Sequence, residues 1–386
     1  MEFVAKTFHG LEDVLAQELK DLGADNVEPV NRAVTFTGDK ELLYRVNLWS
    51  RTALRVLKPE IKFKACNEDQ LYNKVKEIDW SHLMSNEDTL AIDPVVFSKY
   101  FTHSKYVAYK FKDAICDRFR ETTGKRPSVD LKRPNTIFNV HVVEDQFTVS
   151  IDSSGESLNR RGYRTKEHPA PINEVLAAGM ILISDWDKKM TFFDPMCGSG
   201  TIVMEAAMIA ANIAPNFKRK EFAFQRWKDY EPELWEKIYN DAKRKISTPE
   251  ARINGSDISV KSIDISRQSA LDFGIKQYIN FNVNSFSDAV RTGREGMIIM
   301  NPPYDERLRS ADVVKLYSGI GERLKSKFSG WEAWIISSNR DALDSVGLKP
   351  DKKVTLFNGA LECSFQKFSL YRGTKRVNRV KHIIKN

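Results

Sequence analysis

Residues 192–211 read FFDPMCGSGTIVMEAAMIAA, and this stretch decides the fold. A short apolar strand ends at Asp194, Gly198 and Gly200 form a turn, and an apolar helix is predicted to start near Thr201. Glycines in such a turn let a ligand approach the free N–H groups at the helix N-terminus. A tight strand-to-helix turn without a ligand explains the two glycines equally well, and the third glycine of a dinucleotide fingerprint is absent.

The chain around this stretch alternates between predicted strands and helices. We expect seven strands in the C-terminal half, at 191–196, 252–258, 279–286, 296–303, 331–338, 352–359 and 363–372. Helical stretches separate the first six, and a short loop joins the last two, which should pair as an antiparallel hairpin. The alternation predicts an α/β fold with a doubly wound, mostly parallel, Rossmann-like sheet in which 212–250 is an insertion.

The N-terminal half has a different pattern, typical of two small α+β units. Residues 1–57 predict a strand at 33–38 between helices at 10–23 and 40–53. Residues 58–155 predict a strand, two helices and a hairpin, at 89–97, 67–80, 104–124 and 136–155 respectively. Residues 156–386 then hold a connecting segment and the C-terminal domain.

Composition and charge narrow the class of protein. The chain has 386 residues, of which 41% are hydrophobic and 29% charged, and it contains neither a signal peptide pattern nor an apolar run of the roughly 20 residues that span a bilayer. We therefore expect a cytoplasmic protein. The four cysteines are far apart in the sequence, which favours buried thiols over a metal site. A net charge of +8, with ten Lys/Arg against four Asp/Glu over 98–133, suggests a polyanionic partner.

Two acidic residues follow neighbouring predicted strands. Asp194 could accept a hydrogen bond from a ligand's ammonium group, and Asp257 ends the next strand, where doubly wound sheets bind ribose. The alternative interpretation is that Asp257 is the N-cap of the following helix. Two acids around a glycine turn suit a nucleoside that carries an amino acid, which describes S-adenosylmethionine better than NAD.

The fourth predicted strand ends in Asn301-Pro302-Pro303-Tyr304. The prolines fix the backbone, so that the Asn301 side-chain oxygen and the Pro302 carbonyl can converge on an –NH2 group. Holding both hydrogens of a conjugated amine turns its lone pair towards an electrophile, and Tyr304 offers a face for a flipped base. The alternative is a buried strand that simply ends in proline.

Several motifs together resemble the THUMP-domain class I RNA guanine-N2 methyltransferases, and most closely the bacterial 23S rRNA (guanine-N2)-methyltransferase family. They are HGLEDVLAQELKDLGA at 9–24, DSSGESLNRRGYR at 152–164, DPMCGSGTIVMEAAMIA at 194–210, GSDIS at 255–259 and NPPYDERL at 301–308. The resemblance covers nearly the whole chain. It implies a ferredoxin-like domain at 1–57, a THUMP RNA-binding domain at 58–155, and an S-adenosylmethionine-dependent methyltransferase at 156–386.

The resemblance also implies roles for individual residues. The cofactor would bind Asp194, Pro195, Cys197, Gly198, Gly200, Thr201, Asp257 and Ser285. Guanine would be held by Asn301, Pro302, Pro303 and Tyr304. RNA would contact Lys105, Lys110, Lys112, Arg118, Arg126, Lys132, Arg133, Arg160, Arg161 and Arg164. The last three lie in the connecting segment, where pinning the structure together is an equal alternative. The nearby Phe101, Tyr106 and Tyr109 could stack on bases, but we expect them to pack in a core.

Three residues depart from the family pattern: Asp305 stands for Gly, Ser285 for the Asp that accepts from the adenine amine, and Asn173 for Lys. Either Ser285 or Asp288 could take over the contact with the adenine amine. Some relatives also carry a second fused methyltransferase domain. Two other functions remain open on the sequence: a transfer RNA guanine-N2 methyltransferase, and an RNA-binding ribosome assembly factor with an inactive methyltransferase domain.

Overall fold

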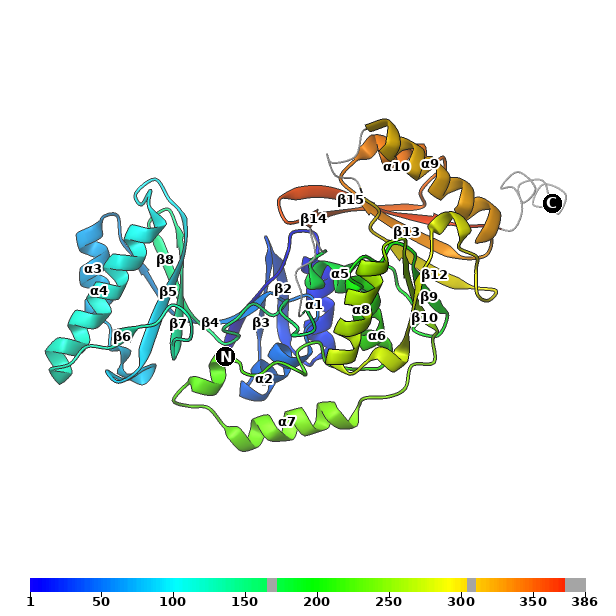
Figure 1. The fold of residues 1–386 in the computed structure, drawn as a ribbon. Coiled ribbons are helices and arrows are strands. Elements are labelled where there is room, and N and C mark those ends of the chain that lie inside the picture. Colours follow the sequence, from blue (N-terminus) through cyan, green and yellow to red (C-terminus); the bar gives the residue numbers. More distant parts are fainter. Residues whose placement is uncertain (165–171, 304–309, 372–386) are drawn as a thin grey trace, which may run out of the picture. The chain divides into compact units, whose positions relative to one another are not determined.

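The computed structural model describes residues 1–164, 172–303 and 310–371, and these form two compact units (Figure 1). The first unit comprises Met1–Thr7, Leu15–Leu158 and Arg219–Asp241. The second comprises Phe8–Val14, Asn159–Lys218 and the described residues from Ala242 onward. Each unit has its own sheet.

The first unit is built on one eight-stranded sheet with the order β2-β3-β1-β4-β8-β7-β5-β6. Its strands are β1 (Glu2–Lys6), β2 (Asp25–Val30), β3 (Ala33–Thr37), β4 (Arg55–Lys64), β5 (Thr89–Phe97), β6 (Ser128–Val129), β7 (Thr136–Val143) and β8 (Gln146–Asp152). Strand β4 pairs antiparallel with both β1 and β8, so it joins the two predicted α+β segments into one sheet. The predicted limit between 57 and 58 falls inside β4. Pro59 lacks an N–H, and the register of β4 shifts directly after it.

Helices cover this sheet where the sequence has apolar residues at helical spacing. They are α1 (Glu12–Asp21), α2 (Lys40–Trp49), α3 (Glu68–Glu77), η1 (Trp80–His82) and α4 (Ser104–Thr123). Asp39 and Asn67 cap α2 and α3 by accepting from Leu42 N and Gln70 N, and Gly124 ends α4 in the left-handed conformation. Trp80 is buried with its ring edge-on to those of Phe111 and Phe138.

The insertion at 219–241 belongs to the first unit, although the chain on both sides of it belongs to the second. It contains η2 (Ala223–Arg226) and most of α7 (Pro232–Arg244). The ring of Tyr44 on α2 stacks on that of Phe224 with centroids 4.2 Å apart and meets the edge of Trp235 at 6.3 Å. Lys40 Nζ lies 2.8 Å from Glu231 Oε1. These contacts make the insertion an integral part of the N-terminal unit.

The second unit is a seven-stranded sheet with the order β11-β10-β9-β12-β13-β15-β14. Its strands are β9 (Thr191–Asp194), β10 (Ile253–Asp257), β11 (Ile279–Val283), β12 (Gly296–Met300), β13 (Glu332–Ser337), β14 (Lys352–Asn358) and β15 (Leu361–Ser369). The first five run parallel, and β15 is antiparallel to both β13 and β14. The doubly wound sheet and its terminal hairpin are thus confirmed.

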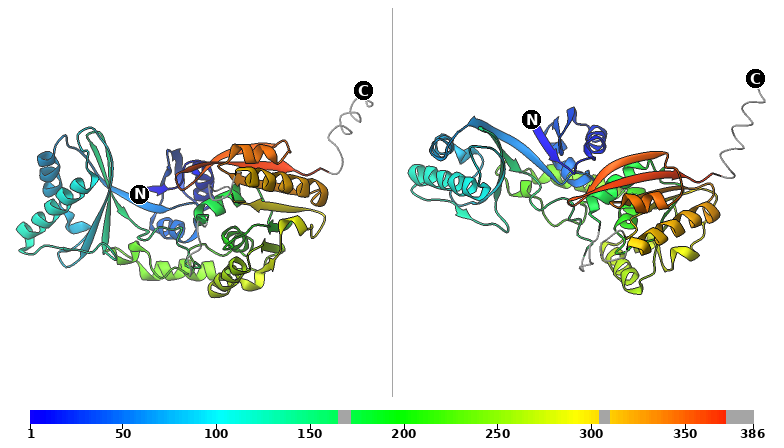
Figure 2. Two further views of the ribbon diagram at one scale, coloured as in Figure 1. Left: turned by 45° about the horizontal axis from the view of Figure 1, so that its top comes forward. Right: turned by 90° about the horizontal axis from the view of Figure 1, so that it is seen from above.

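Helices lie on both faces of this second sheet (Figure 2). They are α5 (Glu174–Ile183), α6 (Thr201–Ala210), α8 (Val260–Phe273), α9 (Ser310–Lys327) and α10 (Arg340–Ser345), with the short turns η3 (Lys276–Tyr278) and η4 (Phe286–Asp288). Helices α6 and α8 pack on β9, β10 and β11, whereas α9 and α10 contribute to a core beneath β12 and β13. All residues of the central strand β12 are buried, so the position of its C-terminal end is fixed.

Candidate active site

The glycine turn between β9 and α6 is held in a conformation that few other residues adopt. Gly198 and Gly200 have φ of 52° and 80°, in the left-handed region. A Cβ on Gly200 would lie 3.0 Å from Ser266 Oγ, the hydroxyl that donates to the Gly198 carbonyl at 2.8 Å. Cys197 N donates to Ser256 O at 2.9 Å and fastens the turn to β10. The turn is therefore a narrow, bare stretch of backbone at the C-terminal end of two parallel strands.

Asp257 bonds to this turn through one carboxylate oxygen and to the start of α8 through the other. Oδ2 accepts from Gly198 N at 2.9 Å, and Oδ1 accepts from Ser259 N at 2.9 Å. The N-cap of α8 is Ser259, not Asp257. A carboxylate has about four acceptor positions, so each oxygen keeps capacity for a further hydrogen bond.

Asp194 is a buried acid at the end of β9, with 1% of its surface exposed. Its Oδ1 accepts from Met196 N at 3.1 Å, and β9 pairs with β10 through Asp194 and Gly255. Burial and, to a lesser degree, the negative charge of Asp257 raise the pKa of Asp194 well above the usual carboxyl value. A cation beside this carboxyl would favour its ionised form, so the position suits an ammonium group.

The other predicted residues of the turn are mostly enclosed. Burial, and then Asp194 and Asp257, raise the pKa of the Cys197 thiol well above its usual range, so it stays neutral. Pro195 is buried, with its carbonyl accepting from Ser256 Oγ at 3.3 Å. Ser285 follows β11 and caps η4, half-buried, with its hydroxyl bonded to Ser287.

Asn301 comes directly after β12, whose neighbour in the sheet is β9. Its Oδ1 is buried and has no hydrogen-bond partner in the described part of the chain. An unsatisfied buried acceptor costs about 1–3 kcal/mol, so a donor from a ligand would stabilise it. Pro302 is buried and Pro303 exposed. Tyr304 and Asp305 lie outside the described residues.

The connecting segment is tied to α6, and this corrects one predicted RNA contact. Arg161 is fully buried, and its Nε lies 3.5 Å from Oε1 of the equally buried Glu205, which also accepts from Tyr163 Oη at 3.0 Å. Arg161 therefore does not reach RNA, because its guanidinium is enclosed among protein atoms. The interpretation that it pins the structure is the one that fits.

Arg164 also acts within the protein. Its Nη2 donates to Ile172 O at 2.8 Å and to Thr201 Oγ1 at 3.1 Å, and its Nη1 lies 3.3 Å from Glu174 Oε1. Thr201, predicted to bind the cofactor, is 2% exposed and its hydroxyl serves this contact. The bonds fix the first residue of α6 relative to α5. Arg160 is exposed.

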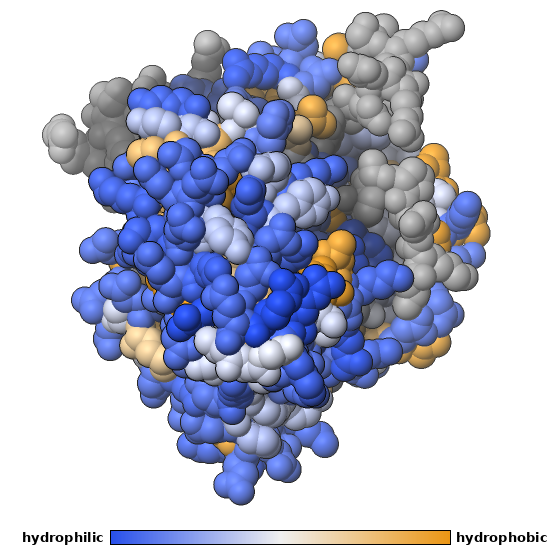
Figure 3. Space-filling view, turned by 90° about the vertical axis from the view of Figure 1, so that its left-hand side faces the viewer, coloured by the Kyte–Doolittle hydropathy of each residue, from blue (hydrophilic) through white to orange (hydrophobic). Residues whose placement is uncertain are grey.

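The predicted RNA-binding residues of the first unit line α4 and the two loops after it. Lys105, Arg126, Lys132 and Arg133 are exposed, whereas Lys110, Lys112 and Arg118 are half-buried. The face that carries α3 and α4 is largely hydrophilic (Figure 3). Phe101 is buried as expected, but Tyr106 and Tyr109 are 39% and 59% exposed, with the ammonium groups of Lys110 and Lys112 over their rings. The expectation of core packing was wrong for both tyrosines, because they lie on the outer face of α4.

Two further features concern the described residues as a whole. None of their helices is long and apolar enough to cross a membrane. No group of His, Cys, Asp and Glu among them is arranged to hold a metal ion. The last fifteen residues, with their basic side chains, lie outside the described part of the chain.

Comparison with known proteins places three families along the chain. The family described as RlmL ferredoxin-like domain matches residues 2–57, the THUMP domain matches 65–152, and the RMKL-like methyltransferase domain matches 161–367. A protein of Synechocystis named as a candidate RNA methyltransferase is 37% identical, with the match covering 96% of this chain and 97% of that protein.

Longer relatives and solved structures match as well. The ribosomal RNA large subunit methyltransferase K/L of Syntrophotalea carbinolica is 38% identical over 96% of this chain, but this covers only 54% of that protein. The chain thus spans about half the length of the K/L relatives it matches. The crystal structure of SMU.472, a candidate methyltransferase complexed with SAH, is 30% identical, covers 97% of this chain and 99% of its own, and superposes with a TM-score of 0.87.

Proposed function

Because this chain belongs to the RMKL-like methyltransferase family, we propose that it transfers a methyl group from S-adenosylmethionine to N2 of a guanine in 23S ribosomal RNA. The observation that carries the proposal is the unpaired Oδ1 of Asn301, held at the end of buried β12 beside the strand that ends in Asp194. An acceptor without a donor, next to a buried acid and a glycine turn, suits an amine substrate and a cationic cofactor.

We call the residues at the C-terminal ends of β9, β10 and β12, namely Asp194, the glycine turn, Asp257 and Asn301, the active-site rim. The chemistry of these residues fits S-adenosylmethionine. Asp194 would hold the ammonium group of its methionine part, since a buried carboxyl gains a partner there. The bare backbone at Gly198 and Gly200 leaves room for close approach, and Asp257 keeps acceptor capacity for the ribose hydroxyls. When bound, the cofactor supplies an electrophilic methyl group on a sulfonium. Ser285 is the candidate for the adenine amine.

Asn301 and Pro302 would position the guanine amine. The Asn301 Oδ1 accepts one hydrogen of the amine and the Pro302 carbonyl the other, which turns the nitrogen lone pair out of conjugation with the ring. Tyr304 would stack on the base. No strong base is required, because the ammonium formed on guanine is very acidic and water can take its proton.

The N-terminal unit would bind the RNA. In this proposal residues 1–57 and 58–155 hold the RNA through phosphate contacts that weaken with salt, and 156–386 perform the chemistry. The exposed side chains of Lys105, Arg126, Lys132 and Arg133 are available for such contacts. We place the protein in the cytoplasm, with no metal required.

The test uses purified protein, isotopically labelled S-adenosylmethionine and RNA that lacks the modification. Ribosomal and transfer RNA are separated afterwards, and labelled nucleosides are identified by mass spectrometry. We expect label in N2-methylguanosine from 23S RNA. Label confined to transfer RNA would keep the chemistry and change the substrate, and no label despite cofactor binding would favour an assembly factor.

Asn301→Ala and Asn339→Ala form a matched pair in this assay. Asn339 follows the neighbouring strand β13, but its Oδ1 already accepts from Ala342 N at 2.9 Å as the cap of α10. We expect Asn301→Ala to reduce turnover at least a hundredfold, the effect of losing a well-placed transition-state contact, while cofactor affinity stays unchanged. Asn339→Ala should cost only about 1 kcal/mol of stability. Equal turnover in the two variants would refute the role of Asn301.

A further inference from the structure

A hollow of about 490 Å³ in the first unit is lined by Arg133, Lys220, Glu221 and Gln225. One wall comes from the loop after β6, and the other from the insertion at 219–241, which packs on this unit. The volume is within the range of ligand-binding pockets, roughly 300–1,000 Å³. None of the insertion residues in the hollow belongs to the active-site rim.

Basic side chains gather around the carboxylate of Glu221, which lines the hollow. Glu221 Oε2 lies 3.0 Å from Arg133 Nε and 2.9 Å from its Nη2, and Arg226 Nη1 lies 3.0 Å from the same oxygen. Lys220 is exposed and has no ion-pair partner in the described part of the chain. Glu221 therefore holds the two guanidinium groups close together, and Arg226 also interacts with the carboxylate of Asp130.

One of these guanidinium groups has an unused donor. Arg226 Nε is buried and forms no hydrogen bond within the described residues. An unsatisfied buried donor on a charged group costs at least 1–3 kcal/mol. The planar fork of arginine matches the oxygens of phosphate, and the guanidinium group that lines the hollow is that of the exposed Arg133.

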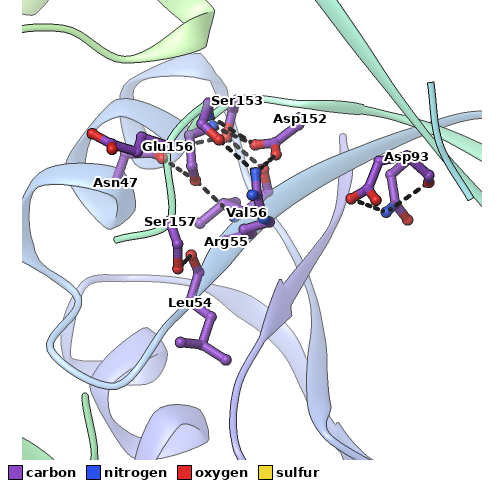
Figure 4. Close-up of polar contacts among 12 residues, drawn as sticks. Asn47, Leu54, Arg55, Val56, Asp93, Asp152, Ser153, Glu156 and Ser157 are labelled. Atoms are coloured by element: carbon purple, nitrogen blue, oxygen red, sulfur yellow. Dashed lines mark hydrogen bonds and ion pairs between the residues drawn. The ribbon is translucent and has the colours of Figure 1, made fainter. Parts of the chain in front are cut away.

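Both walls of the hollow are fixed before any ligand arrives. Arg219 anchors the start of the insertion by donating to the carbonyls of Ser154 at 3.0 Å and Ser157 at 3.1 Å, as well as to that of Glu156. The turn at 152–157 is itself rigid: Asp152 accepts from Arg55, and Ser153 Oγ bonds with Asn47 and Val56 (Figure 4). The side chains of Lys220 and Glu221 therefore extend from a backbone whose position is fixed by the neighbouring Arg219.

The opposite wall is shaped by Asp130. Its Oδ1 accepts from Lys132 N at 2.8 Å and Arg133 N at 3.1 Å, and these hydrogen bonds lower the pKa of Asp130. The loop therefore presents the exposed Lys132 and Arg133 in one orientation. A further cation adjacent to Arg133 suits a polymer of phosphates better than an isolated anion.

We propose that Arg133 and Lys220 form a binding pocket for a backbone phosphate of the RNA substrate, built jointly by the THUMP segment and the insertion from the methyltransferase segment. The proposal rests on RNA being the substrate. It assigns to the insertion a function that the sequence pattern of 212–250 does not reveal. Contact through a phosphate makes this site independent of RNA sequence.

The test measures RNA affinity rather than methylation. A fluorescein-labelled RNA hairpin is titrated with full-length protein at a series of KCl concentrations, with anisotropy as the readout. Lys220→Ala and Arg133→Ala remove exposed cations of the pocket. Lys237→Ala is the matched control, because it removes an exposed lysine from the same insertion, on α7, outside the hollow. Lys220→Arg restores the charge.

We expect each pocket variant to weaken binding about two- to fivefold at fixed salt, the range of a largely exposed ion pair. The slope of log K against log[KCl] should fall by about 0.7–0.9 for each lost phosphate contact. Lys237→Ala and Lys220→Arg should match the unaltered protein. Unchanged slopes in both pocket variants, or an equal loss in Lys237→Ala, would overturn the pocket and leave the proposed function standing.

Two other results separate the alternatives. If the unaltered protein binds no RNA, both the pocket and the proposed function are wrong. If guanosine monophosphate raises the melting temperature of the unaltered protein but not of Lys220→Ala, while RNA binding is the same in both, the pocket belongs to a free nucleotide and the proposal fails.

Discussion

Asp194→Asn is expected to stabilise the chain in the absence of cofactor and to weaken its binding of S-adenosylmethionine. The carboxyl group is 1% exposed, accepts one backbone hydrogen bond from Met196 at 3.1 Å, and has Asp257 nearby. Asparagine has almost the same shape and can keep that bond through Oδ1. The substitution therefore removes a buried negative charge with little change in packing.

The sign of the effect follows from proton linkage. Burial raises the pKa of Asp194 in the folded state above its unfolded value of about 3.9, so the folded protein binds more protons between the two values. Stability is then lost as the pH rises from the unfolded pKa through the folded one. The Asp194→Asn variant does not lose this stability. The difference in unfolding free energy between the variant and the unaltered protein therefore grows across this pH range and is constant above it.

The size of the effect is set by the shift itself. Each unit by which the folded pKa exceeds the unfolded one costs between about 1 and 2 kcal/mol of folding free energy above the window. For a domain of about 200 residues, 1 kcal/mol corresponds to roughly 2–4 °C in melting temperature. Loss of a charged hydrogen bond to the ammonium group, about 1.5–3 kcal/mol, should weaken cofactor affinity roughly ten- to a hundredfold.

The assay is thermal unfolding of both proteins from pH 4 to pH 8, with calorimetric titration of S-adenosylmethionine across the same range. The affinity of the unaltered protein should rise with pH through the raised pKa, whereas that of Asp194→Asn should stay low and flat. Asp257→Asn is the contrast: it loses one of two backbone hydrogen bonds and should destabilise by about 1 kcal/mol. A less stable Asp194→Asn at pH 8, or one that keeps its cofactor affinity, would refute the reasoning.

Three further outcomes are expected. Arg161→Met leaves the buried Glu205 without its ion-pair partner and should lower the free energy of unfolding, measured in urea, by about 3–5 kcal/mol. The salt dependence of RNA binding should not change, and a changed slope would support the predicted contact between Arg161 and RNA. Gly200→Ala places a Cβ 3.0 Å from Ser266 Oγ at a φ of 80° and should cost about 1–2 kcal/mol of stability and weaken cofactor binding; a cofactor affinity equal to wild type would show that the turn is not close to the ligand. Iodoacetamide should label exposed Cys66 and leave Cys197 unmodified in peptide mass spectra, since Cys197 is buried and its thiol pKa is raised; labelling of Cys197 at the Cys66 rate would contradict this.

The second sheet could be predicted because its signals are local. Each strand is a short apolar run, and the polar residues that follow, such as Asp194, Asp257 and Asn301, mark the C-terminal ends. Parallel strands bring these ends to one edge of a sheet, so sequence order alone places the three residues on the same rim. The distance of each side chain from its ligand is not contained in such a pattern.

The first sheet was harder to predict because its strands lack an apolar pattern. Strand β2 reads DNVEPV and is mostly exposed, β4 contains Pro59, and the sequence signals neither of them nor the short β1. Their existence depends on pairing with strands far away in the chain, as β4 does with β8. The place of the insertion is equally non-local, since it rests on aromatic contacts between Tyr44 and Phe224.

The charged residues of the connecting segment show a limit of another kind. Arg160, Arg161 and Arg164 look alike in sequence, yet the first is exposed, the second is fully buried and the third is bonded to Thr201. Their difference is decided by Glu205 and Thr201, on a helix about forty residues further along the chain. A cluster of basic residues therefore predicts an RNA-binding surface only when none of them forms an ion pair with a buried acidic residue.

Local energetic cost locates the active site independently of any resemblance. The rim combines an unpaired buried oxygen on Asn301 with a buried carboxyl at Asp194, and each of these lowers the stability of the chain without a ligand. An unpaired atom alone is a weak indicator, because the indole nitrogens of Trp227 and Trp334 are also unpaired in the described structure. The phosphate pocket rests on a different criterion, because Arg133 and Lys220 are exposed cations that line one hollow. Measuring RNA affinity tests that assignment.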